Sequence, residues 1–385
     1  MLVAATIFTA QKDRIVQRWR LEGGVPRVPG QKVDNPMVNA EPGTLPDIPL
    51  TWRKEDFIRL PDGVIGPMTT AKAEYTGMMV VYDWVSKEVI WKSDWGNKVL
   101  MPAGYCFADG VIYLNDLEGA SVFVVDVEPE PGRLLKRISH PYLNDLHSLK
   151  RTRRGLLITC SGNDAILELD LDGNILWEWW ATEHGYSLSP SGKERASGRG
   201  QEHRDQYYHT RYHATHVNTA VVRDESERYV LALLFHQGQL IQIDRSLPET
   251  EQHAEVILDG LARPHTLEKF AAGWLCCNSL AKELLILDDN LKIAEHIPYN
   301  GGWIQACTRL SSGHIVLNDV DMSCLVEFAG APFEMIGTTA YDANWRMAEL
   351  VEVPKHHEAS FLRATNAVAR AAAAPLGFPS EAKPQ

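Results

Sequence analysis

Short apolar runs separated by turn residues recur along the chain in groups of four. The clearest group extends from His147 to Trp180 and reads HSLKRTRRGLLITCSGNDAILELDLDGNILWEWW. Its runs are rich in Leu, Ile and Trp and alternate with Gly, Asn and Asp, which is typical of β-strands joined by tight turns. The same order of runs returns from His265 and again from Ile304. Three copies of one four-stranded unit indicate a repeat protein.

Three weaker copies of the unit begin near Asp56, Pro102 and His216. The turn between the first and second runs shows the spacing of the six copies, at Gly63, Gly110, Gly155, Tyr229, Gly273 and Gly313. Apart from one long step, this spacing is about forty-five residues, which is typical of a propeller blade. We therefore expect an all-β fold, a single β-propeller of six four-stranded blades.

The two ends of the chain offer a seventh blade. Segment 1–22 has the pattern of a hairpin made of two outer strands, and MAELVEV at 347–353 could pair with it. Such a pairing would close the ring of a propeller domain that spans residues 1–365. The Ala-rich and then Pro-rich sequence that follows predicts a short helix and a flexible C-terminal tail over 366–385.

The long step in the repeat spacing contains a polar insertion at 181–212, rich in Ser, Gly, Arg, His and Tyr. Loops of this length without strands of their own are usually either functional covers or disordered segments. Because the insertion returns to the fold directly before His216, we expect a lid-like loop over the channel mouth near that residue.

Composition and charge narrow the class of partner. Hydrophobic residues make up 45% of the chain and charged residues 23%, as in a globular protein with a large core. The net charge is -12 and no segment gathers basic residues, which argues against nucleic acid as a partner. No run reaches the ~18 apolar residues of a membrane span, and the first ten residues lack a secretory pattern. We expect no membrane partner and a cytoplasmic location, and the oligomeric state stays open.

Three polar residues stand at one position of the repeat. His147, His265 and Gln305 each precede the turn glycine of their unit by eight residues. The first strand of every propeller blade lines the central channel, so equivalent positions on these strands converge there. His216 opens a fourth unit in a similar context, THVN beside LHSL and PHTL. The sequence thus predicts that His147, His216, His265 and Gln305 meet in the channel.

Convergent neutral imidazoles are the ligands that a divalent transition metal prefers, and three protein ligands leave a position open for water or substrate. We therefore predict a metal held by His147, His216, His265 and Gln305. Asp145, two residues before His147, could orient that imidazole. His213 lies where the insertion returns to the channel and is a further catalytic candidate. The alternative is that each imidazole only hydrogen-bonds a neighbouring strand, with His213 in a solvated loop.

The segment ILELDLDGNILWEWWATEHGY, followed by THVNTAVV and LIQID, resembles the arylsulfotransferase-like propeller family. In that family a blade ending in W-x-W leads into an H-x-N motif. The resemblance covers about residues 141–245 and implies an active site at the channel, with His216 and Asn218 in it and His147 and His265 as further site histidines. Members that transfer sulfuryl groups carry a sulfate-binding arginine on the next strand, where this chain has Leu234 and Phe235.

Three functions follow from these observations. The first is a metal-dependent enzyme, of the lyase, hydrolase or oxygenase type, that acts on a small organic molecule at the channel. The second is metal-free sulfuryl or group transfer by a channel histidine, as the family resemblance implies. The third is a non-catalytic propeller that binds a protein partner.

Overall fold

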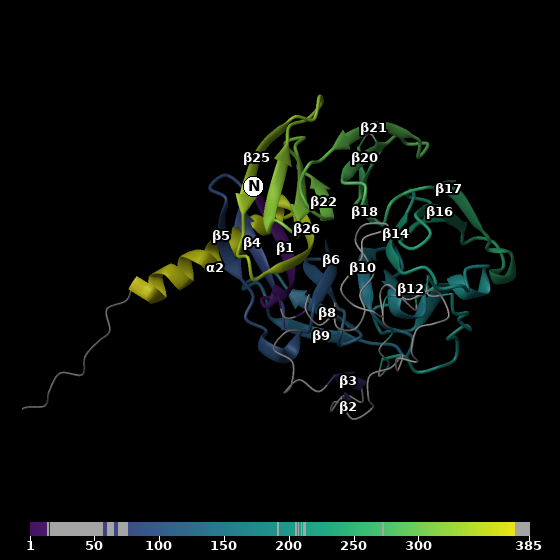
Figure 1. Cartoon of the computed structure of the whole chain (residues 1–385). Coiled ribbons are helices and arrows are strands. Elements are labelled where there is room, and N and C mark those ends of the chain that lie inside the picture. The colour runs from purple at the N-terminus through teal and green to yellow at the C-terminus, as the bar shows by residue number, and fades with distance from the viewer. Residues whose placement is uncertain are drawn as a thin grey trace, which may run out of the picture.

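The computed structural model describes residues 1–13, 15, 57–59, 65–67, 76–190, 192–204, 206, 208, 210, 213–271 and 273–373. Within these residues, six antiparallel sheets of four strands are arranged as blades around a central axis (Figure 1). The predicted all-β propeller is confirmed, with six blades and no seventh in the described part of the chain.

Five blades are each formed by four consecutive strands. Their bounds are β6 (Pro102–Ala108), β7 (Val111–Asp116), β8 (Ser121–Asp126) and β9 (Leu134–Ile138); β10 (Leu146–Arg151), β11 (Leu156–Cys160), β12 (Ala165–Leu169) and β13 (Ile175–Trp180); β14 (Val217–Val222), β15 (Tyr229–Leu234), β16 (Gln239–Asp244) and β17 (Ala254–Leu258); β18 (Pro264–Phe270), β19 (Gly273–Asn278), β20 (Glu283–Leu287) and β21 (Ile293–Pro298); β22 (Ile304–Arg309), β23 (Ile315–Asp319), β24 (Cys324–Phe328) and β25 (Met335–Ala340).

The sixth blade joins strands that are far apart in the sequence, in the order β26-β1-β4-β5. β26 (Arg346–Glu352) pairs with β1 (Leu2–Thr9), and β4 (Met78–Asp83) and β5 (Glu88–Lys92) follow. The predicted pairing of the C-terminal segment with the N-terminal one is present, but it completes the sixth blade instead of forming a seventh. β1 takes the second place in this blade and not an outer place, because β4 and β5 lie outside it.

One predicted blade segment lies elsewhere. The sequence near Asp56 forms a separate two-stranded sheet of β2 (Phe57–Arg59) and β3 (Ile65–Pro67). The expectation that it starts a blade is wrong, because β26 and β1 occupy the inner places of that blade. Gly63, the turn residue of this unit, lies outside the described residues.

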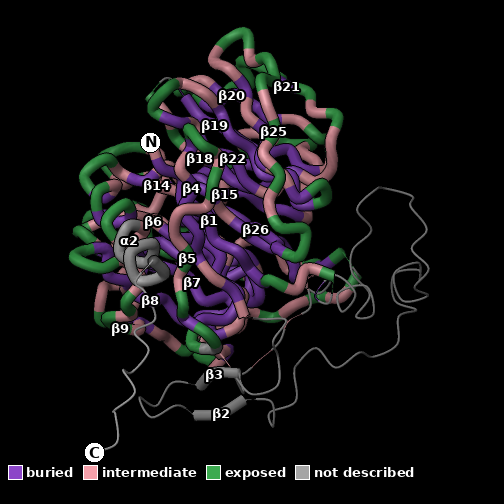
Figure 2. Tube along the Cα trace, turned by 90° about the vertical axis from the view of Figure 1, so that its left-hand side faces the viewer, coloured by how far each residue is buried: buried purple, intermediate pink, exposed green. Residues whose placement is uncertain are grey.

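The core lies between neighbouring blades. On β11, alternate side chains face opposite ways: Leu156 and Ile158 pack toward the preceding blade with Tyr113, whereas Leu157 packs toward the following blade with Val217. A strand that is sandwiched between two blades buries both of its faces. Figure 2 accordingly shows buried strands throughout the body of the molecule, with the exposed residues in its outer turns.

A C-terminal helix, α2 (Lys355–Ala373), packs against the outer strand β5 of the closing blade (Figure 1). Phe361 is fully buried and makes an edge-on contact with Trp91, with 5.2 Å between ring centroids. Glu358 accepts a hydrogen bond of 2.9 Å from the backbone N–H of Leu2. The helix covers 366–373, at the start of the expected tail, because its Ala-rich sequence favours helix. No helix in the described residues is long and apolar enough to span a bilayer.

The first strand of each blade lies innermost, and adjacent innermost strands contact one another around the axis. These strands are β6, β10, β14, β18, β22 and β26. Side chains that leave them on the axial side therefore share one central space, which positions the candidate site.

Candidate functional site

A small cavity opens at the axis between the innermost strands. Its lining includes His147 on β10, His265 on β18 and Gln305 on β22, so the prediction that these three side chains share one channel is confirmed. Asn218 on β14 and Glu349 on β26 line the same cavity. Each of these five blades therefore contributes a polar side chain from its innermost strand.

Strand pairing shows which cavity residues are equivalent. In four consecutive blades, the first residue of the innermost strand that pairs with the second strand is Leu146, Val217, Pro264 or Ile304. The residue that follows each of them lines the cavity, which makes His147, Asn218, His265 and Gln305 equivalent.

His216 does not share that position. The expectation that it matches His147 and His265 is wrong, because the strand register aligns Asn218 with them and leaves His216 two residues earlier. Its equivalents in the neighbouring blades are Asp145 and Arg263. All three residues have left-handed backbone, with φ of 49° at His216, 48° at Asp145 and 56° at Arg263.

The cavity histidines are held by the backbone. The Nδ1 atom of His147 lies 3.1 Å from the carbonyl oxygen of Asp145. Nδ1 of His265 lies 3.1 Å from the carbonyl oxygen of Arg263 and 2.9 Å from the hydroxyl oxygen of Ser279, which can accept as well. A carbonyl only accepts hydrogen bonds, so Nδ1 carries the proton in the neutral form of each ring and Nε2 keeps its lone pair. Burial lowers the pKa of His265 to about 3, so this ring is neutral at physiological pH.

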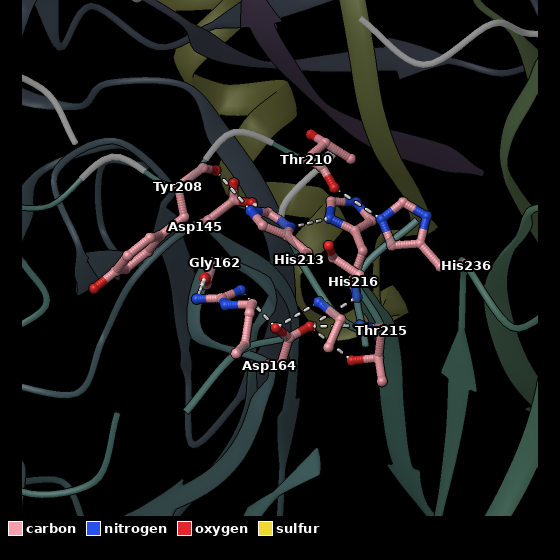
Figure 3. Close-up of polar contacts among 12 residues, drawn as sticks. Asp145, Gly162, Asp164, Tyr208, Thr210, His213, Thr215, His216 and His236 are labelled. Carbon is pink, nitrogen blue, oxygen red and sulfur yellow. Dashed lines mark hydrogen bonds and ion pairs between the residues drawn. The ribbon is translucent and has the colours of Figure 1, made fainter. Parts of the chain in front are cut away.

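A second cluster lies at the channel mouth and consists of Asp145, His213 and His216 (Figure 3). The Nδ1 atoms of the two histidines are 2.8 Å apart, and an Asp145 carboxylate oxygen lies 3.9 Å from Nδ1 of His213. Nε2 of His213 donates to the carbonyl oxygen of Tyr208 at 2.6 Å, so its Nδ1 is the acceptor side of the ring. We call these three residues the mouth cluster.

Among the described residues, the mouth cluster is the group of His, Cys, Asp and Glu side chains that could hold a metal ion, with ligand atoms within 4.8 Å of one another. Burial, and then the neighbouring imidazoles, lower the pKa of His216 well below its usual value, which keeps the ring able to ligate. The predicted ligand set shares only His216 with this group. Ligation by His147, His265 and Gln305 stays a prediction.

Asp164 positions the mouth cluster. Its carboxylate accepts hydrogen bonds from the backbone N–H groups of Ala214, Thr215 and His216 at 2.7–3.0 Å. It also pairs with Arg195 at 2.6 Å, and it is fully buried. No sequence pattern indicated this role, because Asp164 stands in a Gly-Asn-Asp turn about fifty residues before the loop that it holds.

The insertion contacts the channel mouth beside the cluster. The carbonyl of Thr210 accepts a hydrogen bond from Nε2 of His236 at 2.8 Å, as that of Tyr208 does from His213. Asn144, just before β10, donates to the carbonyl of His203 at 2.7 Å. The end of the insertion, at Tyr208 and Thr210, thus lies beside the mouth cluster as expected, and its role as a lid stays a prediction.

Two further residues shape the site and were not identified from the sequence. The Phe235 ring lies between the rings of His216 and His265, with centroids 5.1 and 5.2 Å away. The Arg263 guanidinium lies 4.8 Å from the Phe235 centroid, and its Nη1 donates to Nδ1 of His236 at 2.7 Å. Arg263 precedes a predicted site histidine by two residues, and that short spacing is the one signal that could have pointed to it.

A group of opposite charges lies along the same innermost strands, formed by Lys150 on β10, Glu268 on β18 and Glu349 on β26. Burial raises the pKa of Glu268 to about 7 and raises that of Glu349. Burial alone would lower the pKa of Lys150, but the two carboxylates raise it. Thr308 donates to Glu268 at 2.9 Å.

No protein-family model and no curated protein matches the chain. Among solved structures, a chain in a nidogen/laminin complex has a TM-score of 0.52 at 12% identity, over 72% of this chain and 95% of that one. A streptogramin B lyase has a TM-score of 0.48 at 9% identity, over 77% and 85%. A putative 6-phosphogluconolactonase from Bacteroides uniformis has 0.48 at 13%, over 72% and 81%.

At these identities the similarity shows the propeller fold alone. The resemblance to the arylsulfotransferase-like family stays a prediction.

Proposed function

We propose that this propeller is an enzyme that acts on a small organic molecule in the channel cavity, with a divalent transition metal held by the mouth cluster. The observation that carries the proposal is the close approach of Asp145, His213 and His216 at the channel mouth. Two imidazoles and a carboxylate form a donor set that suits zinc, cobalt or nickel.

Three protein ligands leave coordination positions for water and substrate. The metal would polarise a substrate oxygen or lower the pKa of a bound water, which fits lyase or hydrolase chemistry. His147 belongs to the cavity and makes a ring contact with His216, with centroids 4.6 Å apart. A substrate in the cavity would therefore lie beside the residues that would hold the metal.

The test is elemental analysis of protein purified without chelator. Wild type is expected to hold a divalent transition metal in stoichiometric amount, and His213→Ala to lose the mouth-cluster ion. His296→Ala is the matched control, because His296 is an exposed histidine on β21 paired with Glu283. Wild-type protein that is active yet carries no stoichiometric metal would overturn the proposal.

A second candidate function is metal-free group transfer by His216, as in arylsulfotransferase-like proteins. Nδ1 of His216 donates to His213 in the metal-free tautomer, which leaves Nε2 as a nucleophile. Arg263 favours this candidate, since a planar cation beside the site could bind an oxyanion. Incubation with an aryl sulfate, followed by intact mass measurement, is expected to show a sulfuryl adduct in wild type and none in His216→Ala. Wild type without an adduct or phenol release would exclude it.

A further inference from the structure

Three of the four equivalent cavity residues share a second property beyond their register. Each uses one polar atom to contact a backbone carbonyl: Nδ1 of His147 to Asp145, Nδ1 of His265 to Arg263, and the amide nitrogen of Asn218 to Pro264 at 2.9 Å. The atom left over is an acceptor in every case. Three consecutive blades thus bring side chains that each keep one acceptor atom to the lining of one cavity.

The amide oxygen of Asn218 has no hydrogen-bond partner, although the residue is only 4% exposed. Buried polar atoms in proteins are almost always satisfied. Its amide nitrogen is fixed by the Pro264 carbonyl, so the oxygen cannot be exchanged for the nitrogen without losing that bond. The group that completes Asn218 must therefore be a cation or a hydrogen-bond donor inside the cavity.

We propose that His147, Asn218 and His265 form a second divalent-metal site, distinct from the mouth cluster. Metal-bound histidines typically donate their other ring nitrogen to a carbonyl or carboxylate, which is the arrangement of both rings here. Two imidazoles and a carbonyl-type oxygen are donors for a borderline transition metal. Glu349 lines the same cavity and supplies negative charge when it is ionised.

Gln305 is not a ligand of this site. Its Oε1 accepts from Nε1 of Trp303 at 3.2 Å and faces Arg346 at 3.5 Å, so the oxygen is already engaged. The predicted ligand set is thereby altered in two places, with Asn218 replacing His216 and Gln305 omitted.

Phe235 contacts one histidine of each site, His216 and His265. The two sites are adjacent, because His147 is in ring contact with His216. In the mouth cluster, the ligand atom of His216 would be Nδ1. In the cavity site, the ligand atoms of His147 and His265 would be Nε2. No residue is shared, so each site can be removed without taking a ligand from the other. The second site is independent of the proposed function.

Cobalt is the probe, since its visible absorption reports nitrogen and oxygen coordination. Wild-type protein stripped with chelator is expected to bind two Co²⁺ per chain in a spectroscopic titration. His265→Ala and Asn218→Ala should each bind one, retained at the mouth cluster. His213→Ala should also bind one, retained in the cavity, and His296→Ala should bind two.

The variants separate the two proposals. If His265→Ala and Asn218→Ala bind as much cobalt as wild type, the cavity site is refuted and the mouth cluster stands. If His213→Ala binds as much as wild type, the proposed function loses its metal and the cavity site stands.

Crystals of cobalt-loaded wild type provide a measurement that does not depend on variant folding. Anomalous scattering at the cobalt edge should show a peak bonded to His147, Asn218 and His265. A cavity without such a peak, in crystals with cobalt at the mouth cluster, overturns the inference.

Discussion

Asp164 shows how one residue can position two others that are far away in the sequence. It joins the turn between β11 and β12 to the loop that carries His213 and His216. The groups around its carboxylate, three backbone N–H groups, the Thr215 hydroxyl and Arg195, are all donors, so an ionised acceptor satisfies them best. The geometry of the mouth cluster therefore depends on a carboxylate that would not itself touch metal or substrate.

Replacing Asp164 by Asn tests this role. The amide nitrogen would face a backbone N–H or Arg195, and we expect the free energy of unfolding to fall by about 3 kcal/mol. Metal content should fall as well, because Asp164 would no longer hold the loop that carries His213 and His216. Urea unfolding and elemental analysis measure the two effects. Asp172→Asn is the control, because that side chain is 81% exposed and should change neither quantity. Full metal content in the Asp164→Asn variant would contradict the positioning role.

The sequence located the cavity residues better than it located the mouth cluster. His147, His265 and Gln305 follow the blade repeat, and a periodic pattern is visible along the chain. Asp164 and Arg263 act through contacts between distant segments and a left-handed backbone, which no local pattern reveals. His216 was predicted to line the channel with His147 and His265, but it lies in the mouth cluster, two residues earlier in the register. A long insertion precedes its strand, and a bulge interrupts the pairing that decides the register.

At the scale of elements, α2 connects the closing blade to the next one. Ser360 and Arg363 contact Glu128, which follows β8, and Thr365 donates to the carbonyl of Ile90 in β5 at 2.9 Å. Phe361 lies in the core cluster shared by these two blades. The helix therefore stabilises the seam at which the ring is closed.

Truncating Phe361 to Ala should lower the free energy of unfolding by about 3 kcal/mol, because a fully buried aromatic side chain is removed from a packed core. Leu362→Ala is the matched control, since Leu362 is 44% exposed on the same helix and should cost less than about 0.5 kcal/mol. Thermal and urea denaturation measure both. Equal effects of the two changes would mean that α2 does not stabilise the seam.

The element order of the repeat could be read from the sequence, and five blades lie where the pattern placed them. The sixth blade could not be predicted in full, because its inner strands β26 and β1 are far apart in the chain. The hairpin-like sequence near Asp56 was predicted to begin that blade instead. The sequence of a short strand pair is the same kind of pattern whether the pair belongs to a blade or forms a separate sheet. Only the packing of β1 between β26 and β4 distinguishes them.

At the scale of the whole molecule, Lys150, Glu268 and Glu349 couple three blades through their charges. Between pH ~4.5 and ~7 the folded protein keeps a proton on Glu268 that the unfolded chain has lost, because burial raises the pKa of this carboxyl to about 7. The free energy of unfolding contributed by Glu268 therefore falls as pH rises through this range and is constant above it.

Glu268→Gln removes that titration and keeps the acceptor for Thr308. We expect the variant to be more stable than wild type by about 3 kcal/mol at pH 8, with the difference shrinking to zero as the pH falls toward the unfolded pKa. Urea unfolding at pH 8 and near pH ~5 measures it. Glu295→Gln, an exposed change on β21, should show no such pH dependence. Lower stability of the Glu268→Gln variant than of wild type at pH 8 would contradict the raised pKa.

The closing blade also has a consequence for synthesis. β1 leaves the ribosome before the other strands of the propeller, while β26 leaves after the other five blades have been made. At about 5–20 residues per second, the nascent chain carries β1 for roughly 20 to 70 s before that partner exists. All eight residues of β1 are buried in the finished propeller. Until β26 has been made, the protein is thus an open ring whose apolar first strand is available to a chaperone or to the matching gap in another nascent chain.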